Sequence, residues 1–209
     1  MHIATVPHVE ARELSITGAW LFSPVLRPDD RGLFLESFKG ATFTESLGFE
    51  FSLQQMNISV SRKGTVRGIH FADVPPGQSK YVQCFAGRIL DVVVDIRVGS
   101  PTFGQWDAVE LDTQSRAGLF LSEGLGHGFC ALSDEVTVGY LCSEPYAPTR
   151  EHGINPVDPA LGLPWPQDLD VVLSPKDAAA PSLAEALSGG LLPTFDACQD
   201  WYASLSASH

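Results

Sequence analysis

A histidine and a lysine between residues 64 and 80 are the groups in this sequence best suited to acid–base chemistry. The stretch GTVRGIHF carries His70, and Lys80 follows ten residues later in GQSKYV. A histidine accepts a proton near neutral pH and a lysine can stabilise an oxyanion, so the pair suits removal of a proton next to a carbonyl group. A structural role is the more common explanation for a single histidine on a strand, and these residues alone leave it open.

Two further segments carry groups that can move protons or stack on a ring. In EGLGHGFCAL, glycines surround His127 and bring the backbone close to whatever that side chain faces. In VGYLCSEPYAP, Tyr140 ends an apolar run and Tyr146 follows it, and a tyrosine can act as a general acid or stack on a base or sugar. A tight turn beside a buried histidine, and amphipathic packing of the tyrosines, explain the same residues without chemistry.

The elements that would position these groups are β-strands. From residue 88 to 98, RILDVVVDIRV has apolar residues at every even position from 90 onward, with Asp91, Asp95 and Arg97 among the odd ones. This period of two predicts a strand with one core face and one wholly or partly polar face. Similar runs occur at about 15–26, 33–38, 51–61, 65–71, 79–85, 105–112, 118–122, 126–132 and 135–142. Many short strands separated by turns predict an antiparallel sandwich or barrel.

Helical signal is weak and peripheral. One short helix is predicted near residues 41–47, and another near 182–187, where Pro181 precedes the segment and Gly189 and Gly190 end it. Between residues 144 and 166 proline is frequent, which predicts a loop across the surface and no strand in the sheet. The tail after Phe195 either docks on the body or frays.

The spacing of Arg67 and His70 raises a geometric problem. Residues three apart on a regular strand point to opposite faces of the sheet. Gly68 offers a solution, because a glycine within a strand pattern often marks a β-bulge. A bulge here would turn both side chains toward one cavity.

Composition excludes several classes of function. The chain has 209 residues, which fits one domain, and a net charge of −12 with a pI near 4.7. A nucleic-acid binder needs a positive field, so that class is excluded. Residues 1–14 mix charges with no uninterrupted apolar run, and no stretch approaches the length of a membrane span, so neither a signal peptide nor a membrane segment is expected. We expect a cytoplasmic protein.

The motifs of common cofactor sites are missing from the sequence. No glycine-rich dinucleotide or nucleoside triphosphate loop occurs. The four cysteines, at positions 84, 130, 142 and 198, have no C-x-x-C spacing and suggest reduced thiols. His70 and His127 each stand alone, whereas a metal-binding sandwich usually has two histidines close in sequence. Neither a metal nor a cofactor is expected.

Taken together, several ordered motifs closely resemble the dTDP-4-dehydrorhamnose 3,5-epimerase family. The resemblance covers about residues 14–187 and includes DDRGLFLESF (29–38), TVRGIHF (65–71), DVVVDIRVGSPTFGQW (91–106), EGLGHGF (123–129), YLCSEPYAP (140–148), DPALGLPWP (158–166) and LSPKDAAAP (173–181). It implies an all-β, cupin-like jelly-roll β-sandwich with short peripheral helices, forming a single domain over residues 1–209 with its core at about 14–187 and a tail at 188–209.

The resemblance also implies roles for individual residues. His70 looks like the catalytic base and Asp177 like the carboxylate that orients it, because a carboxylate on one imidazole nitrogen fixes the tautomer. Lys80 looks like the cation near the keto oxygen, and Tyr140 occupies the place of the general acid. Tyr146 is expected to stack on the nucleotide base, and Asp91 is expected to orient His127. All the remaining matches are expected substrate contacts: Arg67, Arg31, Phe34, Glu36, Gln55, Asn57, His127, Tyr146 and Asp91.

The expected reaction is epimerisation of carbon 3, carbon 5 or both in a dTDP-4-keto-6-deoxyhexose, without cofactor or metal. The family's homodimers exchange amino-terminal strands, so the resemblance implies the same assembly here. Which subunit supplies contacts such as Arg31 stays open. The alternatives are a metal-dependent cupin enzyme and a non-catalytic nucleotide-sugar binder with the same fold.

Overall fold

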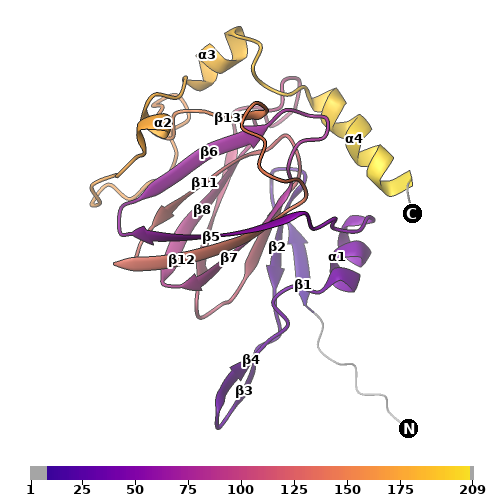
Figure 1. Ribbon diagram of the computed structural model, residues 1–209, viewed down its shortest axis with the longest axis vertical. Coiled ribbons are helices and arrows are strands. Elements are labelled where there is room, and N and C mark those ends of the chain that lie inside the picture. Colours follow the sequence, from indigo (N-terminus) through magenta and orange to yellow (C-terminus); the bar gives the residue numbers. More distant parts are fainter. Residues whose placement is uncertain (1–8, 208–209) are drawn as a thin grey trace.

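Two antiparallel β-sheets face each other in the computed structural model, which describes residues 9–207 (Figure 1). Most of the amino-terminal stretch for which no signal peptide is expected lies outside the described residues. The six-stranded sheet has the order β1 (Glu10–Glu13), β2 (Ala19–Ser23), β10 (Gly118–Leu121), β7 (Lys80–Ala86), β12 (Glu135–Cys142), β5 (Gln55–Arg62). The five-stranded sheet has the order β13 (Glu151–Gly153), β6 (Val66–Ala72), β11 (Gly126–Ala131), β8 (Arg88–Val94), β9 (Trp106–Asp112). The predicted jelly-roll sandwich is confirmed.

Short helices and one hairpin complete the structure. The helices are α1 (Gly40–Leu47), α2 (Pro175–Ala178), α3 (Leu183–Ser188) and α4 (Phe195–Ala207). The hairpin of β3 (Arg27–Asp29) and β4 (Gly32–Phe34) projects away from both sheets (Figure 1). Both predicted helices, near 41–47 and 182–187, are confirmed. Across residues 9–207, none of the helices has the length and apolar character needed to cross a membrane.

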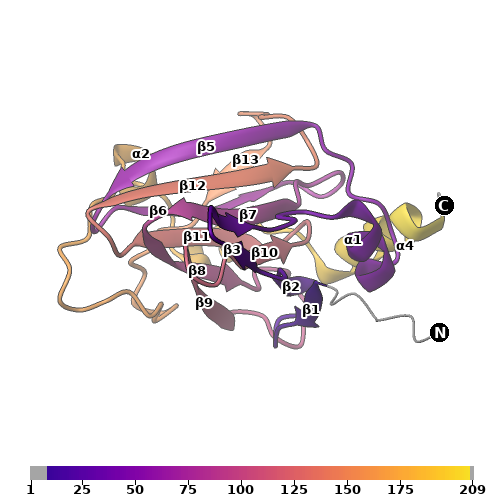
Figure 2. The same ribbon diagram turned by 90° about the horizontal axis from the view of Figure 1, so that it is seen from below.

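The core consists of three apolar clusters separated by the two sheets. The inner faces of the sheets bury residues such as Val93, Leu119 and Val138 between them, and Figure 2 shows the two layers from the side. The segment after β13, with Ile154 and Trp165, covers the outer face of the five-stranded sheet. An aromatic cluster around Phe43 of α1 covers part of the other sheet. The five-stranded sheet is therefore buried on both faces, whereas the six-stranded sheet is buried on its inner face and on the part of its outer face that the aromatic cluster covers.

The strand predicted over residues 88–98 is shorter than expected. β8 ends at Val94, because Asp95 turns back to bind Arg97 through the backbone and the guanidinium, and the pair is fully buried. The face expected to be polar does carry Asp91, Asp95 and Arg97, but all three are buried. The polar face of this segment therefore points into the interior, where each buried polar side chain needs a hydrogen-bond partner.

Two predictions for the carboxyl-terminal part need correction or completion. Residues 144–166 were expected to form only a loop, but β13 adds an edge strand to β6. The prolines lie on either side of these three residues, so they do not interrupt the pairing. The tail docks as α4: the Arg97 guanidinium lies over the Phe195 ring at 5.1 Å, Cys198 is buried, and the Tyr202 hydroxyl donates to the Glu123 carbonyl.

The edge strand β5 has its polarity reversed relative to an ordinary surface strand. Its polar residues, Gln55, Asn57, Ser59 and Ser61, alternate with apolar ones. The polar set points into the sandwich, whereas Met56, Ile58 and Val60 are exposed on the outer face, Ile58 to 63%. Such an exposed apolar row is typical of a surface that another molecule covers.

Candidate active site

A cavity of about 270 Å³ opens between the edges of the two sheets. Its wall contains eight of the residues predicted from the sequence: Gln55, Asn57, Arg67, His70, Lys80, Tyr140, Tyr146 and Asp177. These residues come from β5, β6, β7, β12, the loop after β12 and α2. The fold therefore brings residues more than 100 positions apart in the chain into one site.

A bulge in β6 places Arg67 and His70 on the same side, as the sequence predicted. Opposite β11, His127 pairs with His70 and Phe129 with Arg67, so β6 holds one residue more than its partner over this interval. Gly68 has a φ of +132°, and a Cβ there would lie 2.5 Å from the Gly128 Cα. Only glycine fits, because both the backbone conformation and the close approach of β11 exclude a side chain.

His70 is held by a carboxylate from a different element. Its Nε2 lies 2.7 Å from Asp177 Oδ1, and its side chain is 36% exposed, toward the cavity. Asp177 is fixed in turn because the Ser174 side chain caps α2 and accepts a hydrogen bond from the Asp177 backbone N–H at 3.0 Å. With the Nε2 proton donated to Asp177, the Nδ1 lone pair is free to accept a proton.

The charge on Asp177 is stabilised by this contact. Burial alone would raise its pKa, but the hydrogen bond and charge of His70, with smaller contributions from Ser174 and Lys176, outweigh burial and hold the pKa below its ordinary value. The carboxylate is therefore ionised around neutral pH and can accept a hydrogen bond from the imidazole beside it.

Lys80 and Tyr140 face the cavity from the opposite sheet. Burial lowers the pKa of Lys80, partly offset by Cys142, Glu151 and Asp91. Burial also raises the pKa of Tyr140, with Cys142 adding to the rise and Arg67 opposing it. The phenol therefore keeps its proton at neutral pH, and a buried ammonium suits the binding of a nearby negative charge.

A second histidine–carboxylate pair lies beside the first but deeper. His127 Nε2 is 2.9 Å from Asp91 Oδ1, as expected if Asp91 orients it. The His127 side chain is only 9% exposed and Asp91 is fully buried. Within the described chain neither residue belongs to the wall of the cavity, although His127 is the direct cross-strand neighbour of His70.

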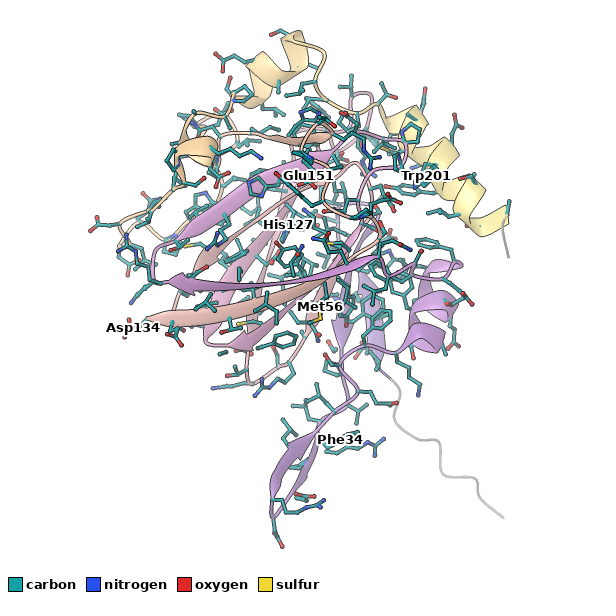
Figure 3. All side chains as sticks on the ribbon, in the orientation of Figure 1. Phe34, Met56, His127, Asp134, Glu151 and Trp201 are labelled. Atoms are coloured by element: carbon teal, nitrogen blue, oxygen red, sulfur yellow. The ribbon has the colours of Figure 1, made fainter. Side chains whose placement is uncertain are left out.

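Besides His127 and Asp91, three predicted substrate contacts lie outside the cavity of this chain. Arg31 and Phe34 stand on the projecting hairpin and Glu36 follows it, all exposed. Arg31 pairs only with its neighbour Asp29 among the described residues, at 2.5 Å. Figure 3 shows Phe34 on this hairpin, well away from His127 and Glu151. The fold of one chain does not bring these three residues to His70.

Five further residues of the wall were not predicted: Gln78, Glu151, His152, Ser174 and Lys176. Ser174 and Lys176 belong to the same LSPKD motif as Asp177, and Gln78 lies two residues before Lys80, so their positions were a usable signal. Glu151 and His152 gave none, because the strand that carries them was not expected. His152 pairs with Asp73 at 2.8 Å.

Within residues 9–207, no three histidine, cysteine, aspartate or glutamate side chains converge as a metal site requires. The groups at the cavity can instead accept, donate and hold protons. His70 and Tyr140 stand on different sheets with the cavity between them, and Lys80 supplies an amine that can carry a positive charge. This arrangement is suited to moving a proton off and onto a carbon atom.

Comparison with known proteins agrees with this geometry. The profile of a family described as dTDP-4-dehydrorhamnose 3,5-epimerase matches residues 13–185. A dTDP-4-dehydrorhamnose 3,5-epimerase of Mycolicibacterium smegmatis is 58% identical over 195 residues, covering 93% of this chain and 96% of that protein.

Solved structures show the same likeness. An epimerase of Mycobacterium tuberculosis superimposes with a TM-score of 0.92 at 48% identity, covering 94% of this chain and 99% of that one. A 3'-monoepimerase of Streptomyces bikiniensis, in complex with dTDP-quinovose, gives a TM-score of 0.91 at 47% identity, covering 93% and 98%. The chain thus belongs to the dTDP-4-dehydrorhamnose 3,5-epimerase family.

Proposed function

We propose that this protein inverts carbon 3, carbon 5 or both of a dTDP-4-keto-6-deoxyhexose, in the biosynthesis of a deoxysugar. The observation that carries the proposal is the placement of His70 and Tyr140 on opposite sheets across one cavity. Inversion requires such a pair, because a single group that returned its own proton would restore the starting configuration. Two of the relatives named above are a dTDP-4-dehydrorhamnose 3,5-epimerase and a 3'-monoepimerase whose structure contains dTDP-quinovose.

Each residue then has a defined part in the proposed reaction. His70, oriented by Asp177, removes the proton from the carbon next to the keto group, and the electron pair moves onto the keto oxygen. Lys80 stabilises the resulting enolate, and Arg67 adds a second positive charge on the same side as His70. The Tyr140 O–H gives its proton to the other face of the carbon. Exchange with water returns His70 and Tyr140 to their starting protonation states.

The nucleotide would bind where Tyr146 lies, at the mouth of the cavity. Tyr146 is 58% exposed, which leaves its ring free to stack on the base. We assign Arg31, Phe34 and Glu36 to the cavity of a second copy of the chain. The projecting hairpin and the exposed apolar row on β5 support a homodimer with exchanged amino-terminal segments.

The cytoplasm is the compartment that suits this proposal. All four cysteines are free and buried, as expected for a protein of a reducing compartment.

Proton NMR of dTDP-4-keto-6-deoxyglucose incubated with the protein in heavy water tests the proposal directly. The spectrum reports which carbons take up deuterium and which change configuration. His70→Asn, which keeps the size of the side chain and loses the base, should abolish both. Exchange at the wild-type rate in that variant would refute the assignment of the base, and an inert wild-type protein would refute the activity.

A further inference from the structure

Two amides on the inner face of β5 connect the proposed acid to the backbone of the loop after β12. Gln55 Oε1 accepts a hydrogen bond from the Tyr146 backbone N–H at 2.9 Å. Gln55 Nε2 donates to Asn57 Oδ1 at 2.8 Å. Residues two apart on a strand share one face, so the two side chains follow each other along the wall of the cavity.

The direction of this chain of hydrogen bonds is fixed at its first member. A backbone N–H can only donate, so the atom of Gln55 that faces Tyr146 must be its oxygen. The Gln55 amino group therefore faces Asn57 and requires an oxygen there. The Asn57 amino group is left to point toward β12, where it lies 3.7 Å from Cys142 Sγ.

Tyr140 is the residue of β12 directly opposite Asn57. Both side chains line the cavity, and Asn57 works against the rise in the pKa of Tyr140 that burial causes. An amide N–H that donates to the phenol oxygen leaves the phenol proton free for another acceptor. The same N–H would stabilise the phenolate that remains once this proton has moved to carbon.

We infer that Gln55 and Asn57 are positioning residues that orient the Tyr140 hydroxyl as the proton donor, anchored at the backbone of Tyr146. The inference rests on the proposed function and adds to it, because the resemblance implied only nucleotide contacts for these two residues. Asn57 acts through Tyr140, and Gln55 acts through Asn57.

The anchor lies where a bound nucleotide can reach it. The Ala147 N–H donates to Glu151 Oε1 at 3.1 Å, so consecutive backbone groups bind side chains of β5 and β13, the edge strands of the two sheets. A base stacked on Tyr146 would fix this segment, and with it the amide of Gln55. The acid is thereby aligned in the complex that holds the whole substrate.

Asn57→Asp is the sharpest variant, because it keeps the shape and the acceptor for Gln55 but replaces the donor by a carboxylate. The Tyr140 hydroxyl would then donate to Asp and lose its alignment with the substrate. His70 would still remove the proton and return deuterium to the same face. We expect unepimerised substrate that carries deuterium to accumulate, with the ratio of inversion to exchange about ten- to a hundredfold lower than in the wild type.

Proton NMR in heavy water measures inversion and exchange in the same sample. Gln55→Met removes both hydrogen bonds of the Gln55 amide without introducing a charge, and it should also lower the ratio of inversion to exchange. This second variant keeps the inference testable if Asn57→Asp does not fold. Ser59→Ala is the matched control, since Ser59 is next on the same face of β5 and its hydroxyl has no partner within residues 9–207. It should leave the ratio unchanged.

The outcomes separate the two proposals. If the wild type inverts and exchanges while Asn57→Asp and Gln55→Met keep the wild-type ratio, the positioning role is wrong and the epimerase function stands. An equal loss of inversion and exchange in folded Asn57→Asp also overturns it. If the wild type shows neither reaction, both proposals fall.

Discussion

Two histidine–carboxylate pairs are built on neighbouring strands, and their surroundings differ. In the pair of His70 and Asp177 the imidazole reaches the cavity, and its carboxylate comes from the short helix α2. In the pair of His127 and Asp91 the imidazole is almost enclosed, and its carboxylate lies on the core strand β8. The hydrogen bonds are similar, 2.7 and 2.9 Å. The comparison teaches that access to the cavity, more than the hydrogen bond to a carboxylate, distinguishes the proposed base His70 from the enclosed His127.

The largest expected difference is in turnover. Asp177→Asn should lower kcat by about 10²- to 10⁴-fold, because an amide N–H facing Nε2 would force the histidine proton onto Nδ1, the nitrogen proposed to accept. Asp91→Asn should lower kcat by no more than about tenfold. Steady-state kinetics on the two purified variants checks this, and a larger loss for Asp91→Asn would reverse the assignment of the base.

For the free energy of unfolding we expect the opposite order, with the larger loss in the pair of His127 and Asp91. His127→Leu removes the hydrogen-bond partner of the fully buried Asp91. The second carboxylate oxygen of Asp91, Oδ2, has no hydrogen-bond partner among the described residues even in the wild type. We expect a loss of about 3–5 kcal/mol in the free energy of unfolding, against about 1–2 kcal/mol for His70→Leu, whose partner Asp177 lies at the wall of the cavity.

Chemical denaturation measures both losses. The double variant His127→Leu/Asp91→Leu should regain much of the stability, because no buried carboxylate remains unpaired. A double variant as unstable as the single one would show that the loss comes from packing and not from the carboxylate.

The smallest effect concerns pH. The pKa of Asp177 lies below its ordinary value in the native state, through the hydrogen bond and charge of His70 acting against burial. Its contribution to stability is therefore complete above about pH 4 and is lost as the pH falls through the native pKa. Asp177→Asn should be less stable than the wild type by about 1–2 kcal/mol near neutral pH, and the gap should narrow below about pH 4. Thermal unfolding at several pH values measures it, and a gap that widens in acid would contradict the sign.

The strands of the two large sheets were largely predictable, because alternation has a clear period wherever a strand has seven or eight residues. Two short strands of these sheets were not predicted: β13 has three residues between prolines, which carry no period, and β1 precedes the first predicted run at 15–26. The helix α4 was not predicted, because Cys198 is its only fully buried residue and no stripe of apolar residues runs along the side that packs on the protein. The strand predicted at 88–98 ended early because a buried ion pair, a tertiary feature, turns the chain at Asp95.

The candidate site shows the same limits. Motifs pointed to Asp177, and Gly68 predicted the bulge that turns Arg67 and His70 together. The hydrogen bond between Gln55 and Asn57 depends on rotamers, and the presence of Glu151 in the wall depends on an unexpected strand pairing. Neither can be read from one sequence. The position of Arg31 and Phe34 outside the cavity depends on how copies of the chain assemble, which no pattern within one chain specifies.

The proposed base and the proposed acid belong to different sheets, and the apolar layer between those sheets sets their separation. A conservative change in that layer, for instance at Leu119 or Val138, alters the spacing or tilt of the two sheets without touching a polar residue of the cavity. Such a change would move the proton donor along the sugar ring relative to the base. The choice between one carbon and two is therefore open to selection through the hydrophobic interior alone, with every reactive side chain retained.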